Sequence, residues 1–300
     1  MAIIKNILIT GATGYIGKNL VKRLIENKNT KIKLLIRKNS NLNYFKDFEN
    51  KLSFHYFDST YNSIEELFKT VNFDYVFHLA SISSYDHKSS DISDIIDTNI
   101  KLGNFLLEAM KKYGCKYFIN TSTYWQNYNN LNDKPICLYA STKKAFEDII
   151  DFYCIDKKIK AISLKLYDVY GYDDHRNKLI NSLILSNDSS KPIELTKGEQ
   201  KLYLIYIDDV IDAYEKAMKI VKYKEIDHKI YEIYGEKKYS LGEIIKIIEK
   251  IKKKKLNVKF GAKEYYKFQI MNPKGANKLP RWSCKTSLKE GLKNILDYIG

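Results

Sequence analysis

Short apolar runs alternate with stretches of helical periodicity over roughly the first half of the chain. Apolar runs typical of buried strands occupy, in chain order, residues 5–10, 31–37, 52–56, 75–79, 116–121 and 160–166. Between them, apolar residues recur at helical spacing over residues 15–26, 63–70, 91–112 and 139–156. Strands that alternate with helices in this way predict a parallel sheet with helices on both faces. We therefore expect the α/β class, with a doubly wound parallel sheet.

Three glycines lie in the turn between the first predicted strand and the first predicted helix. Gly11, Gly14 and Gly17 stand in the sequence Gly-Ala-Thr-Gly-Tyr-Ile-Gly. Gly11 permits a tight turn, Gly14 lets backbone amides approach a pyrophosphate at the helix N-terminus, and Gly17 lets the helix pack closely on the strand. The strand before them and the helix after them predict a dinucleotide-binding turn rather than a plain glycine-rich turn.

Arg37 ends the second predicted strand, where an NAD-selective site usually offers a carboxylate to the adenosine ribose. A guanidinium instead suits a 2′-phosphate, and Lys38, Asn39 and Ser40 add hydrogen-bond donors beside it. The sequence therefore favours NADP(H) over NAD(H) as the cofactor. A solvated basic turn is the alternative.

Elements are shorter and more mixed after residue 167. We expect helices at 178–186, 210–221, 241–251 and 287–299, and a strand at 202–207. Asp208 and Asp209 are expected to cap the N-terminus of the helix that follows them. The prediction is a dinucleotide-binding Rossmann domain over residues 1–167, to which residues 202–234 return, and a smaller substrate-binding lobe formed mainly by residues 168–300.

Tyr139 and Lys143 share one face of the predicted helix at 139–156, because residues four apart on a helix are neighbours. An ammonium at that spacing is expected to stabilise the phenolate and lower the pKa of the phenol from about 10. Thr123, which follows the predicted strand at 116–121, stands sixteen residues before Tyr139. The three side chains are the candidate catalytic set, and a coincidence on a helix surface is the alternative.

Composition and charge argue against a nucleic-acid-binding protein, a membrane protein and a metalloprotein. The net charge of +15 comes mostly from dispersed lysines, with four arginines in the chain, and the lysine run at 252–255 reads as a solvated helix end. We therefore expect no nucleic-acid partner. No run approaches the roughly 20 apolar residues of a membrane span, and residue 1 leads directly into the first strand, so a cytoplasmic protein is expected. The four cysteines have no paired metal-ligand spacing, and no metal is expected.

These motifs together resemble the extended short-chain dehydrogenase/reductases, also called the NAD-dependent epimerase/dehydratase family. The segments that carry the resemblance are Thr10-Gly-Ala-Thr-Gly-Tyr-Ile-Gly17, Phe77-His-Leu-Ala-Ser81, Thr98-Asn99, Thr121-Ser-Thr123, Tyr139-Ala-Ser-Thr-Lys143 and Tyr206-Ile-Asp-Asp209. They extend over most of the chain and imply a nicotinamide-dependent oxidoreductase. The resemblance also implies a homodimer that pairs through the helix beginning at Tyr139.

The same resemblance implies roles for individual residues. Thr123 and Tyr139 would act at the reacting oxygen, and Lys143 would bind the nicotinamide ribose. The residues implied along the cofactor are Gly11, Thr13, Gly14, Tyr15, Ile16, Gly17, Arg37, Asp58, Leu79, Ala80, Ser81 and Asn99. Two of these have alternatives: Asp58 as a turn cap, and Asn99 as a polar residue on a helix packed against the sheet.

The residues directly after Thr123 distinguish dehydratases from other members of the family. Sugar-nucleotide 4,6-dehydratases carry an acidic pair there, because removal of water needs a second acid and base, whereas this chain has Tyr124, Trp125 and Gln126. The expected function is therefore NADPH-dependent reduction of the 4-keto group of a nucleoside-diphosphate (deoxy)sugar for surface polysaccharide biosynthesis. An NAD-dependent 4-epimerase is the alternative, and a non-catalytic NADP-binding sensor a remote one. Within the family, the motifs of this chain look more like those of the abequose and paratose synthase branch.

Six residues are expected to bind the nucleotide-sugar substrate. They are Trp125 and Gln126 beside the sugar, Arg176, Lys178 and Gln200 near the nucleotide, and Arg281 from the C-terminal lobe. Many relatives place an Arg-Asp pair where this chain has Leu202 and Tyr203, so the identity of the nucleotide stays open. An ion pair of Arg176 with Asp173 or Asp174, and a core position for Trp125, are the alternatives.

Overall fold

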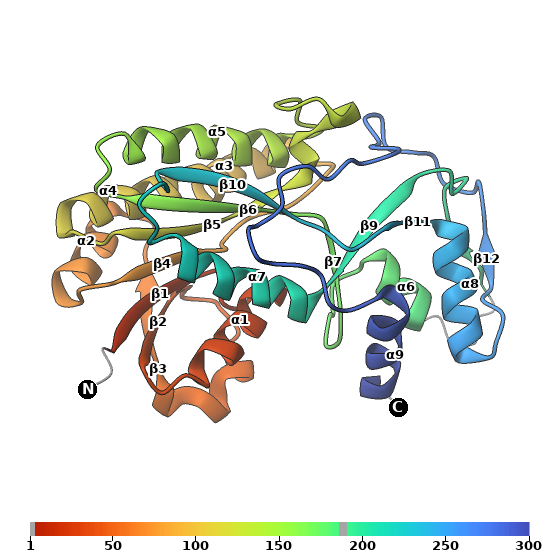
Figure 1. The fold of residues 1–300 in the computed structure, drawn as a ribbon, viewed down its shortest axis with the longest axis horizontal. Helices are drawn as coiled ribbons and strands as arrows, with labels where there is room; N and C mark the ends of the chain where they lie inside the picture. Colours follow the sequence, from red (N-terminus) through yellow and green to blue (C-terminus); the bar gives the residue numbers. More distant parts are fainter. Residues whose placement is uncertain (1–3, 186–190, 300) are drawn as a thin grey trace.

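The computed structural model describes residues 4–185 and 191–299. In this part of the chain a seven-stranded sheet forms the centre of the molecule, with every neighbouring pair of strands parallel. The strand order is β10-β6-β5-β4-β1-β2-β3 (Figure 1). The strands are β1 (Lys5–Thr10), β2 (Thr30–Arg37), β3 (Leu52–Phe57), β4 (Tyr75–His78), β5 (Tyr117–Thr123), β6 (Lys160–Leu166) and β10 (His228–Ile233). The order reverses between β1 and β4, the position at which open α/β sheets bind ligands.

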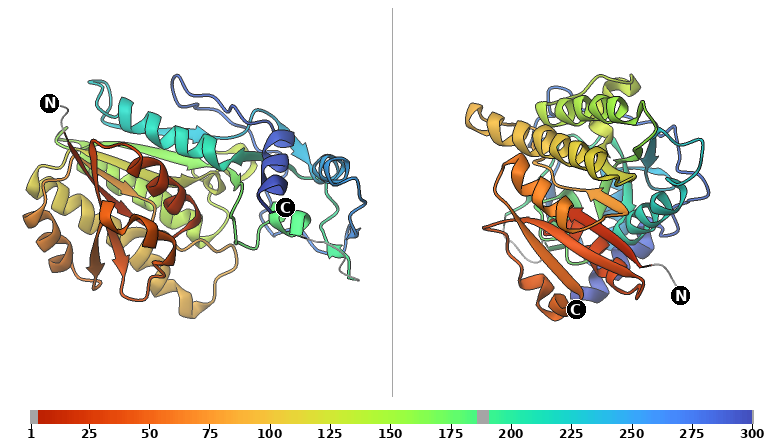
Figure 2. Two further views of the ribbon diagram at one scale, coloured as in Figure 1. Left: turned by 90° about the horizontal axis from the view of Figure 1, so that it is seen from below. Right: turned by 90° about the vertical axis from the view of Figure 1, so that its left-hand side faces the viewer.

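Helices cover both faces of this sheet, so the predicted doubly wound α/β fold is confirmed (Figures 1 and 2). One face carries α1 (Tyr15–Ile25) and α7 (Ile207–Ile220), and the other carries α2 (Tyr61–Thr70), α4 (Leu102–Tyr113) and α5 (Leu138–Cys154). Alternate residues of β1 serve the two faces: Ile7 and Ile9 join one buried apolar cluster, and Leu8 joins the other. The period of two in a strand thus builds both halves of the core.

The helix predicted at 91–112 is interrupted by a wider turn. The chain passes through η2 (Ser89–Asp91), α3 (Ile92–Ile96) and the π-helical segment η3 (Asp97–Lys101) before α4 begins. A further 3₁₀ segment, η1 (Asn43–Lys51), joins β2 to β3, and η4 (Tyr124–Gln126) and η5 (Tyr128–Asn130) follow β5. Single π turns within helices often occur at functional sites, and this one contains Asn99.

A smaller lobe lies beyond the carboxyl ends of the central strands (Figure 1). Its three-stranded sheet has the order β11-β9-β7, and β8 pairs with β12. Its strands are β7 (Asp168–Tyr170), β8 (Ile193–Glu194), β9 (Lys201–Tyr206), β11 (Lys238–Ser240) and β12 (Val258–Lys259), and its helices are α6 (Leu179–Leu185), α8 (Leu241–Lys252) and α9 (Leu288–Ile299). The predicted end of a helix at Ser186 lies outside the described residues. Of the segment 202–234, α7 and β10 lie with the central sheet, whereas β9 pairs with β7 and β11.

The helix α7 begins before the position predicted for it, so the expected capping role of Asp208 and Asp209 is wrong. Its N-cap is Tyr206, and both aspartates lie in the first turn. The buried carboxylate of Asp209 instead accepts hydrogen bonds from the backbone N–H groups of Lys285 and Thr286, at 2.9 and 3.0 Å. Asp209 therefore fastens the segment before α9 to the first turn of α7.

The four cysteines are free thiols. Over the ranges 4–185 and 191–299, no group of histidine, cysteine and carboxylate side chains is arranged to hold a metal ion. Within the same ranges, every helix is too short or too polar to span a bilayer.

Candidate active site

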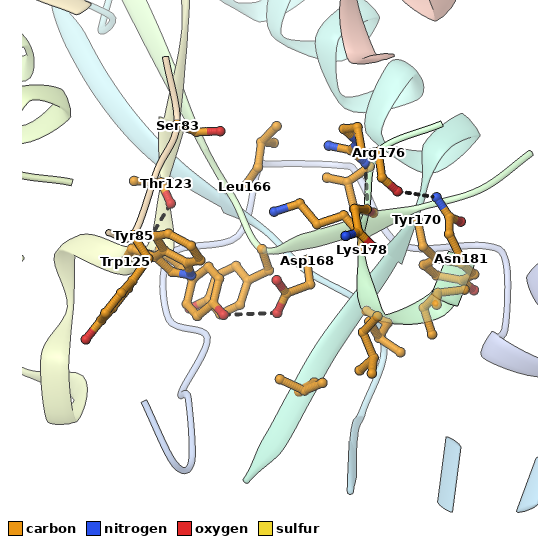
Figure 3. A pocket seen from close by; sticks show the side chains of 18 of the residues that line it. Ser83, Tyr85, Thr123, Trp125, Leu166, Asp168, Tyr170, Arg176, Lys178 and Asn181 are labelled. Carbon is orange, nitrogen blue, oxygen red and sulfur yellow. Dashed lines mark hydrogen bonds between the residues drawn. The ribbon is translucent and has the colours of Figure 1, made fainter. Parts of the chain in front are cut away.

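A large cavity opens where the central sheet meets the smaller lobe. Its volume is about 890 Å³, and its walls come from the glycine turn, the ends of β4 and β5, the start of α5 and residues of the smaller lobe. Figure 3 shows Thr123, Trp125 and Tyr85 on one side, Arg176 and Asn181 on the other, and Asp168 between them. The cavity therefore lies at the carboxyl ends of the strands, on the switch point of the sheet.

The glycine turn brings backbone close to backbone. Gly11 has φ +68°, and a Cβ atom there would lie 2.4 Å from the amide nitrogen of Ala80. A Cβ atom on Gly17 would lie 2.1 Å from the carbonyl oxygen of Gly11. Gly14 is the N-cap of α1 and supplies no side chain to cap it. The turn thus presents the start of α1 to the cavity, a geometry that fits a pyrophosphate.

The residues expected along the cofactor fall into two groups. Seven of them line the cavity: Gly11, Gly14, Tyr15, Ile16, Gly17, Leu79 and Ser81. Thr13 is exposed beside them, and the N–H of Ala80 is bound by the hydroxyl of Thr10 at 3.2 Å. Arg37 is exposed at the carboxyl end of β2, and its guanidinium makes no ion pair within the described ranges. It is therefore available to an anion.

Asp58 occupies the turn after β3 and caps it. Its Oδ1 atom accepts hydrogen bonds from the backbone N–H and the hydroxyl of Thr60, at 2.9 and 2.7 Å. These bonds lower the pKa of Asp58. Thr60 in turn caps α2 by accepting a hydrogen bond from the N–H of Ser63. The contacts of Asp58 are therefore those of a turn cap, the alternative to a role beside the adenine of the cofactor.

The candidate catalytic residues come from two adjacent elements. Thr123 ends β5, Tyr139 lies in the first turn of α5, and Lys143 lies one turn further along the same helix. The ring of Tyr139 meets that of Trp125 edge to face, with centroids 6.0 Å apart. Thr123 and Tyr139 both line the cavity. The geometry thus places a phenol and a hydroxyl on one wall.

Burial raises the pKa of Tyr139 to about 12, and the hydroxyls of Thr123 and Ser81 only partly offset this effect. The expected lowering of this pKa by Lys143 is therefore not found, because desolvation of the phenolate dominates. Lys143 is itself 0% exposed, and its Nζ atom has no hydrogen-bond partner among the described residues. Burial lowers the pKa of Lys143 to about 8, against the opposing effect of Glu147. The phenol of Tyr139 is consequently protonated at neutral pH.

Asn99 joins the end of β4 to α5 from the π-helical segment. Its Oδ1 atom accepts hydrogen bonds from the Ser81 hydroxyl and the Ile82 N–H, at 3.0 and 2.9 Å. Its Nδ2 atom donates to the Ile82 carbonyl and the Thr142 hydroxyl, both at 3.0 Å. These four bonds use the full capacity of the amide. Asn99 therefore supports the cavity wall through Ser81 and leaves no polar group for a ligand.

Arg176 is held in place by protein groups. It forms a bidentate ion pair with the buried Asp174, with both N–O distances at 2.8 Å, and its Nη2 atom also donates to the Val169 carbonyl at 3.1 Å. The guanidinium lies 4.3 Å from the ring centroid of Tyr15. These bonds use three of its five donors, and Arg176 lines the cavity, so its expected role toward a diphosphate stays a prediction.

The segment after β7 packs on the first turns of α1. The Tyr15 hydroxyl donates to the Tyr172 carbonyl at 3.1 Å, and Lys18 forms an ion pair with Asp173. A Cβ atom on Gly171 would lie 2.6 Å from the Tyr15 oxygen. The glycine turn and the smaller lobe therefore share this contact.

The other predicted substrate residues divide between cavity and core. Trp125, Lys178 and Gln200 line the cavity, and the Lys178 ammonium lies 5.9 Å from the Trp125 ring centroid. Gln126 is fully buried and donates to the Ser122 hydroxyl at 2.9 Å, so it does not reach the cavity. Arg281 is exposed and is not part of the cavity wall. Its neighbour Trp282 anchors this loop elsewhere, by donating to the Asp209 carbonyl at 3.1 Å.

Several cavity residues were not predicted from the sequence. Asp168 accepts a hydrogen bond from the Tyr124 hydroxyl at 2.9 Å, and burial raises its pKa. Tyr85 stacks on Tyr266 with centroids 3.9 Å apart. The acidic residue that follows the apolar run at 160–166 is a signal that could have indicated Asp168. No local pattern could have paired Tyr85 with Tyr266, because they lie far apart in the sequence.

Comparisons with known proteins agree with this geometry. The sequence profile described as "NAD dependent epimerase/dehydratase family" matches residues 7–233. CDP-abequose synthase from Yersinia pseudotuberculosis is 30% identical over 270 residues, which cover 89% of this chain and 91% of that protein. The CDP-abequose synthase from Salmonella muenchen is 28% identical, with 97% of each chain covered.

Among solved structures, a variant of UDP-glucuronic acid 4-epimerase from Bacillus cereus superimposes with a TM-score of 0.86. It is 25% identical, with 98% of each chain covered, and was solved with UDP-4-deoxy-4-fluoro-glucuronic acid and NAD. The resemblance expected from the motifs is thus confirmed in both sequence and fold. The chain belongs to the NAD dependent epimerase/dehydratase family.

Proposed function

We propose that this protein is a cytoplasmic, NADPH-dependent ketoreductase that reduces the 4-keto group of a nucleoside-diphosphate (deoxy)sugar for surface polysaccharide biosynthesis. The observation that carries the proposal is the wall formed by Thr123 and Tyr139, on which the phenol is protonated at neutral pH. A protonated phenol suits the reductive direction, in which the new alkoxide needs a proton. The relatives named CDP-abequose synthase support the same direction.

The cofactor residues fit a nicotinamide dinucleotide on two observations. The lack of Cβ atoms at Gly11 and Gly17 lets backbone pack on backbone, so that the turn presents the N-terminus of α1 to the cavity. The buried Lys143 ammonium has no hydrogen-bond partner among the described residues. Lys143 would bind the nicotinamide ribose, and the exposed Arg37 would bind a 2′-phosphate, so NADP(H) is favoured over NAD(H). The chemistry that a bound nicotinamide supplies is hydride transfer to the carbonyl carbon.

The protein's own groups complete the reaction. Tyr139 donates its proton to the developing alkoxide, and the Thr123 hydroxyl donates a hydrogen bond to the same oxygen. Trp125 packs against Tyr139 and, with Tyr85, keeps water from this end of the cavity. Lys178 and Gln200, whose side chains line the cavity, are proposed to bind the nucleotide end of the substrate.

Two features of the proposed protein lie outside the cavity. We place the dinucleotide domain at residues 1–167 with 202–234, and the substrate lobe mainly at 168–300. We also propose a homodimer formed through α5, because Phe152 on this helix and Ile155 directly after it are 61% and 74% exposed. Sedimentation of the purified protein and of Phe152→Glu would test the dimer: a shift of the variant to monomer is expected, and a monomeric parent protein would contradict it.

A 4-epimerase is the second candidate, because the Bacillus cereus structure with a TM-score of 0.86 is a UDP-glucuronic acid 4-epimerase with NAD. The test incubates the protein with CDP-, GDP-, dTDP- and UDP-linked 4-keto-6-deoxy sugars and, separately, with the matching 4-hydroxy sugars. Each is run with NADPH, with NADH and with neither. Absorbance at 340 nm follows the cofactor, and mass spectrometry and NMR identify the product.

The reductase predicts stoichiometric NADPH oxidation and a single C4 alcohol from a 4-keto sugar. Interconversion of two 4-hydroxy sugars without net loss of cofactor would instead establish the epimerase. Formation of a 4-keto-6-deoxy product from a 6-hydroxy sugar would establish a dehydratase and contradict the reading of Tyr124, Trp125 and Gln126.

A further inference from the structure

A buried polar cluster lies behind the catalytic wall, on the inner face of α5. Lys143 and Glu147 are one helical turn apart there, and both are almost completely buried, at 0% and 1% exposed. The Ser122 hydroxyl on β5 donates to Oε1 of Glu147 at 2.5 Å, and Nε2 of Gln126 donates to the Ser122 oxygen at 2.9 Å. The carboxylate of Glu147 is thus oriented by a short chain of hydrogen bonds that starts beside Thr123.

Few charged groups face Lys143. From β4, the buried imidazole of His78 lies near it, and burial together with Lys143 holds the pKa of His78 well below its usual range. His78 is therefore neutral, and it uses Nδ1 to bind the Thr10 hydroxyl at 2.8 Å. Glu147, one turn further along α5, is the charged group among the described residues whose charge raises the pKa of Lys143.

A buried ammonium without a partner is costly, because the charge loses its hydration. The Nζ atom of Lys143 has no hydrogen-bond partner among the described residues, and no direct salt bridge joins it to Glu147. The carboxylate nevertheless lies one helical turn from Lys143, and both side chains are buried, where charges interact more strongly than in water. Its attraction opposes the effect of burial on Lys143.

We propose that Glu147 is a positioning residue, the buried counter-charge that keeps Lys143 in its ammonium form, with Ser122 and Gln126 fixing the direction of its carboxylate. The role of Lys143 toward the nicotinamide ribose rests on the proposed function, whereas the pairing of Lys143 with Glu147 does not. Glu147 itself does not line the cavity, so it acts only through Lys143.

The consequence is a defined pH window for the ammonium. With the pKa of Lys143 at about 8, roughly 90% of the side chain is charged at pH 7. Glu147→Gln removes the charge but keeps an oxygen that can accept from Ser122, so the pKa of Lys143 falls further. With a pKa lower by about one unit, about half of the side chain is neutral at pH 7, and the ribose hydroxyls then lose a charged donor in that fraction.

Direct titration of Lys143 tests the proposal independently of any ligand. The whole protein is labelled with ¹³Cε-lysine, the Lys143 signal is assigned by its loss in Lys143→Met, and its shift is followed by NMR from pH 5 to 11. We expect a midpoint near pH 8 in the parent protein and a midpoint lower by about one unit or more in Glu147→Gln. Glu147→Asp, which keeps the charge, should restore most of the difference.

Ser122→Ala is the matched control, because it removes the hydrogen bond to Glu147 and leaves every charge in place. Its midpoint should fall by clearly less than that of Glu147→Gln, because the carboxylate loses one orienting hydrogen bond but keeps its charge. Equal midpoints in the parent and Glu147→Gln would overturn the proposal, and so would a shift in Ser122→Ala as large as that in Glu147→Gln. Circular dichroism confirms in each case that the variant is folded.

A second readout connects the pair to the cofactor. The dissociation constant of NADPH, measured by fluorescence between pH 6 and 9.5, should rise above about pH 8 in the parent protein. In Glu147→Gln the same rise should begin at a lower pH, with at least a few-fold weaker binding at pH 7.5. If neither NADPH nor NADH binds the parent protein, the proposed function fails, whereas the NMR titration still decides the role of Glu147.

Discussion

Replacing Lys143 by methionine should make the protein more stable at neutral pH while removing its activity. The side chain is 0% exposed, and its ammonium has no hydrogen-bond partner in the described ranges. Folding therefore removes a charge from water without a hydrogen bond to compensate for the lost hydration. Methionine fills a similar volume with a flexible, unbranched chain and carries no charge. The substitution therefore removes the cost of burial without opening a large cavity.

The pKa of Lys143 sets the size of the effect. Burial lowers it from 10.5 to about 8, and each unit corresponds to about 1.36 kcal/mol, so the charged side chain costs about 3 kcal/mol of folding free energy below pH 8. This value is an upper limit for the gain, because Glu147 loses its counter-charge in the same variant. The gain shrinks as the pH rises from 8 to 10.5, since the folded protein then releases the proton that the unfolded chain retains.

Chemical denaturation at pH 7, 9 and 10.5 measures the effect, and thermal melting should show a rise of up to about 6 °C at pH 7. Lys144→Met is the matched control: the neighbouring ammonium is partly exposed and paired with Asp148 at 2.7 Å, so its loss should cost no more than about 1 kcal/mol. The same measurement is made on Lys143→Met alone and on the double variant with Glu147→Gln. If both are less stable than the parent protein at pH 7, the argument from burial is wrong.

Three further changes test the site. Tyr139→Phe should lower turnover by about 10²–10⁴-fold with little effect on NADPH binding, because it removes only the proton donor; steady-state kinetics with normal turnover would end that role. Arg37→Asp should weaken NADPH by about 1–3 kcal/mol and NADH little, and equal losses in titrations of both cofactors would refute NADP selectivity. Gly11→Ala should abolish cofactor binding and lower the melting temperature, since φ is +68° and the added Cβ atom would lie 2.4 Å from the Ala80 nitrogen; binding that survives would show that the turn can relax.

The sequence predicted the central sheet well because its strands are marked by local patterns. The strands at 5–10 and 160–166 have the predicted bounds, and the glycine turn lies where the strand-to-helix transition places it. The start of α5 places Tyr139 and Lys143 one turn apart, as their spacing indicates. Each of these features depends on residues close together in the chain.

The failures arose where distant residues decide the structure. Asp209 precedes a predicted helix and was expected to cap it, but its carboxylate accepts hydrogen bonds from the backbone of Lys285 and Thr286. The contact of Arg176 with the ring of Tyr15 was not predicted, because the two residues lie far apart in the chain. The pKa of Tyr139 was expected to fall because of Lys143, whereas burial by the surrounding residues raises it. None of these effects has a signature in local sequence.

The packing of residues 171–176 on α1 means that the two ends of the cavity do not act independently. Tyr15 belongs to the turn proposed for the pyrophosphate, and it also binds the Tyr172 carbonyl and lies beneath Arg176. We expect a ligand that orders one side of this contact to affect the other side. Any cooperativity transmitted through it must obey reciprocity, so the factor by which cofactor tightens substrate binding equals the factor by which substrate tightens cofactor binding.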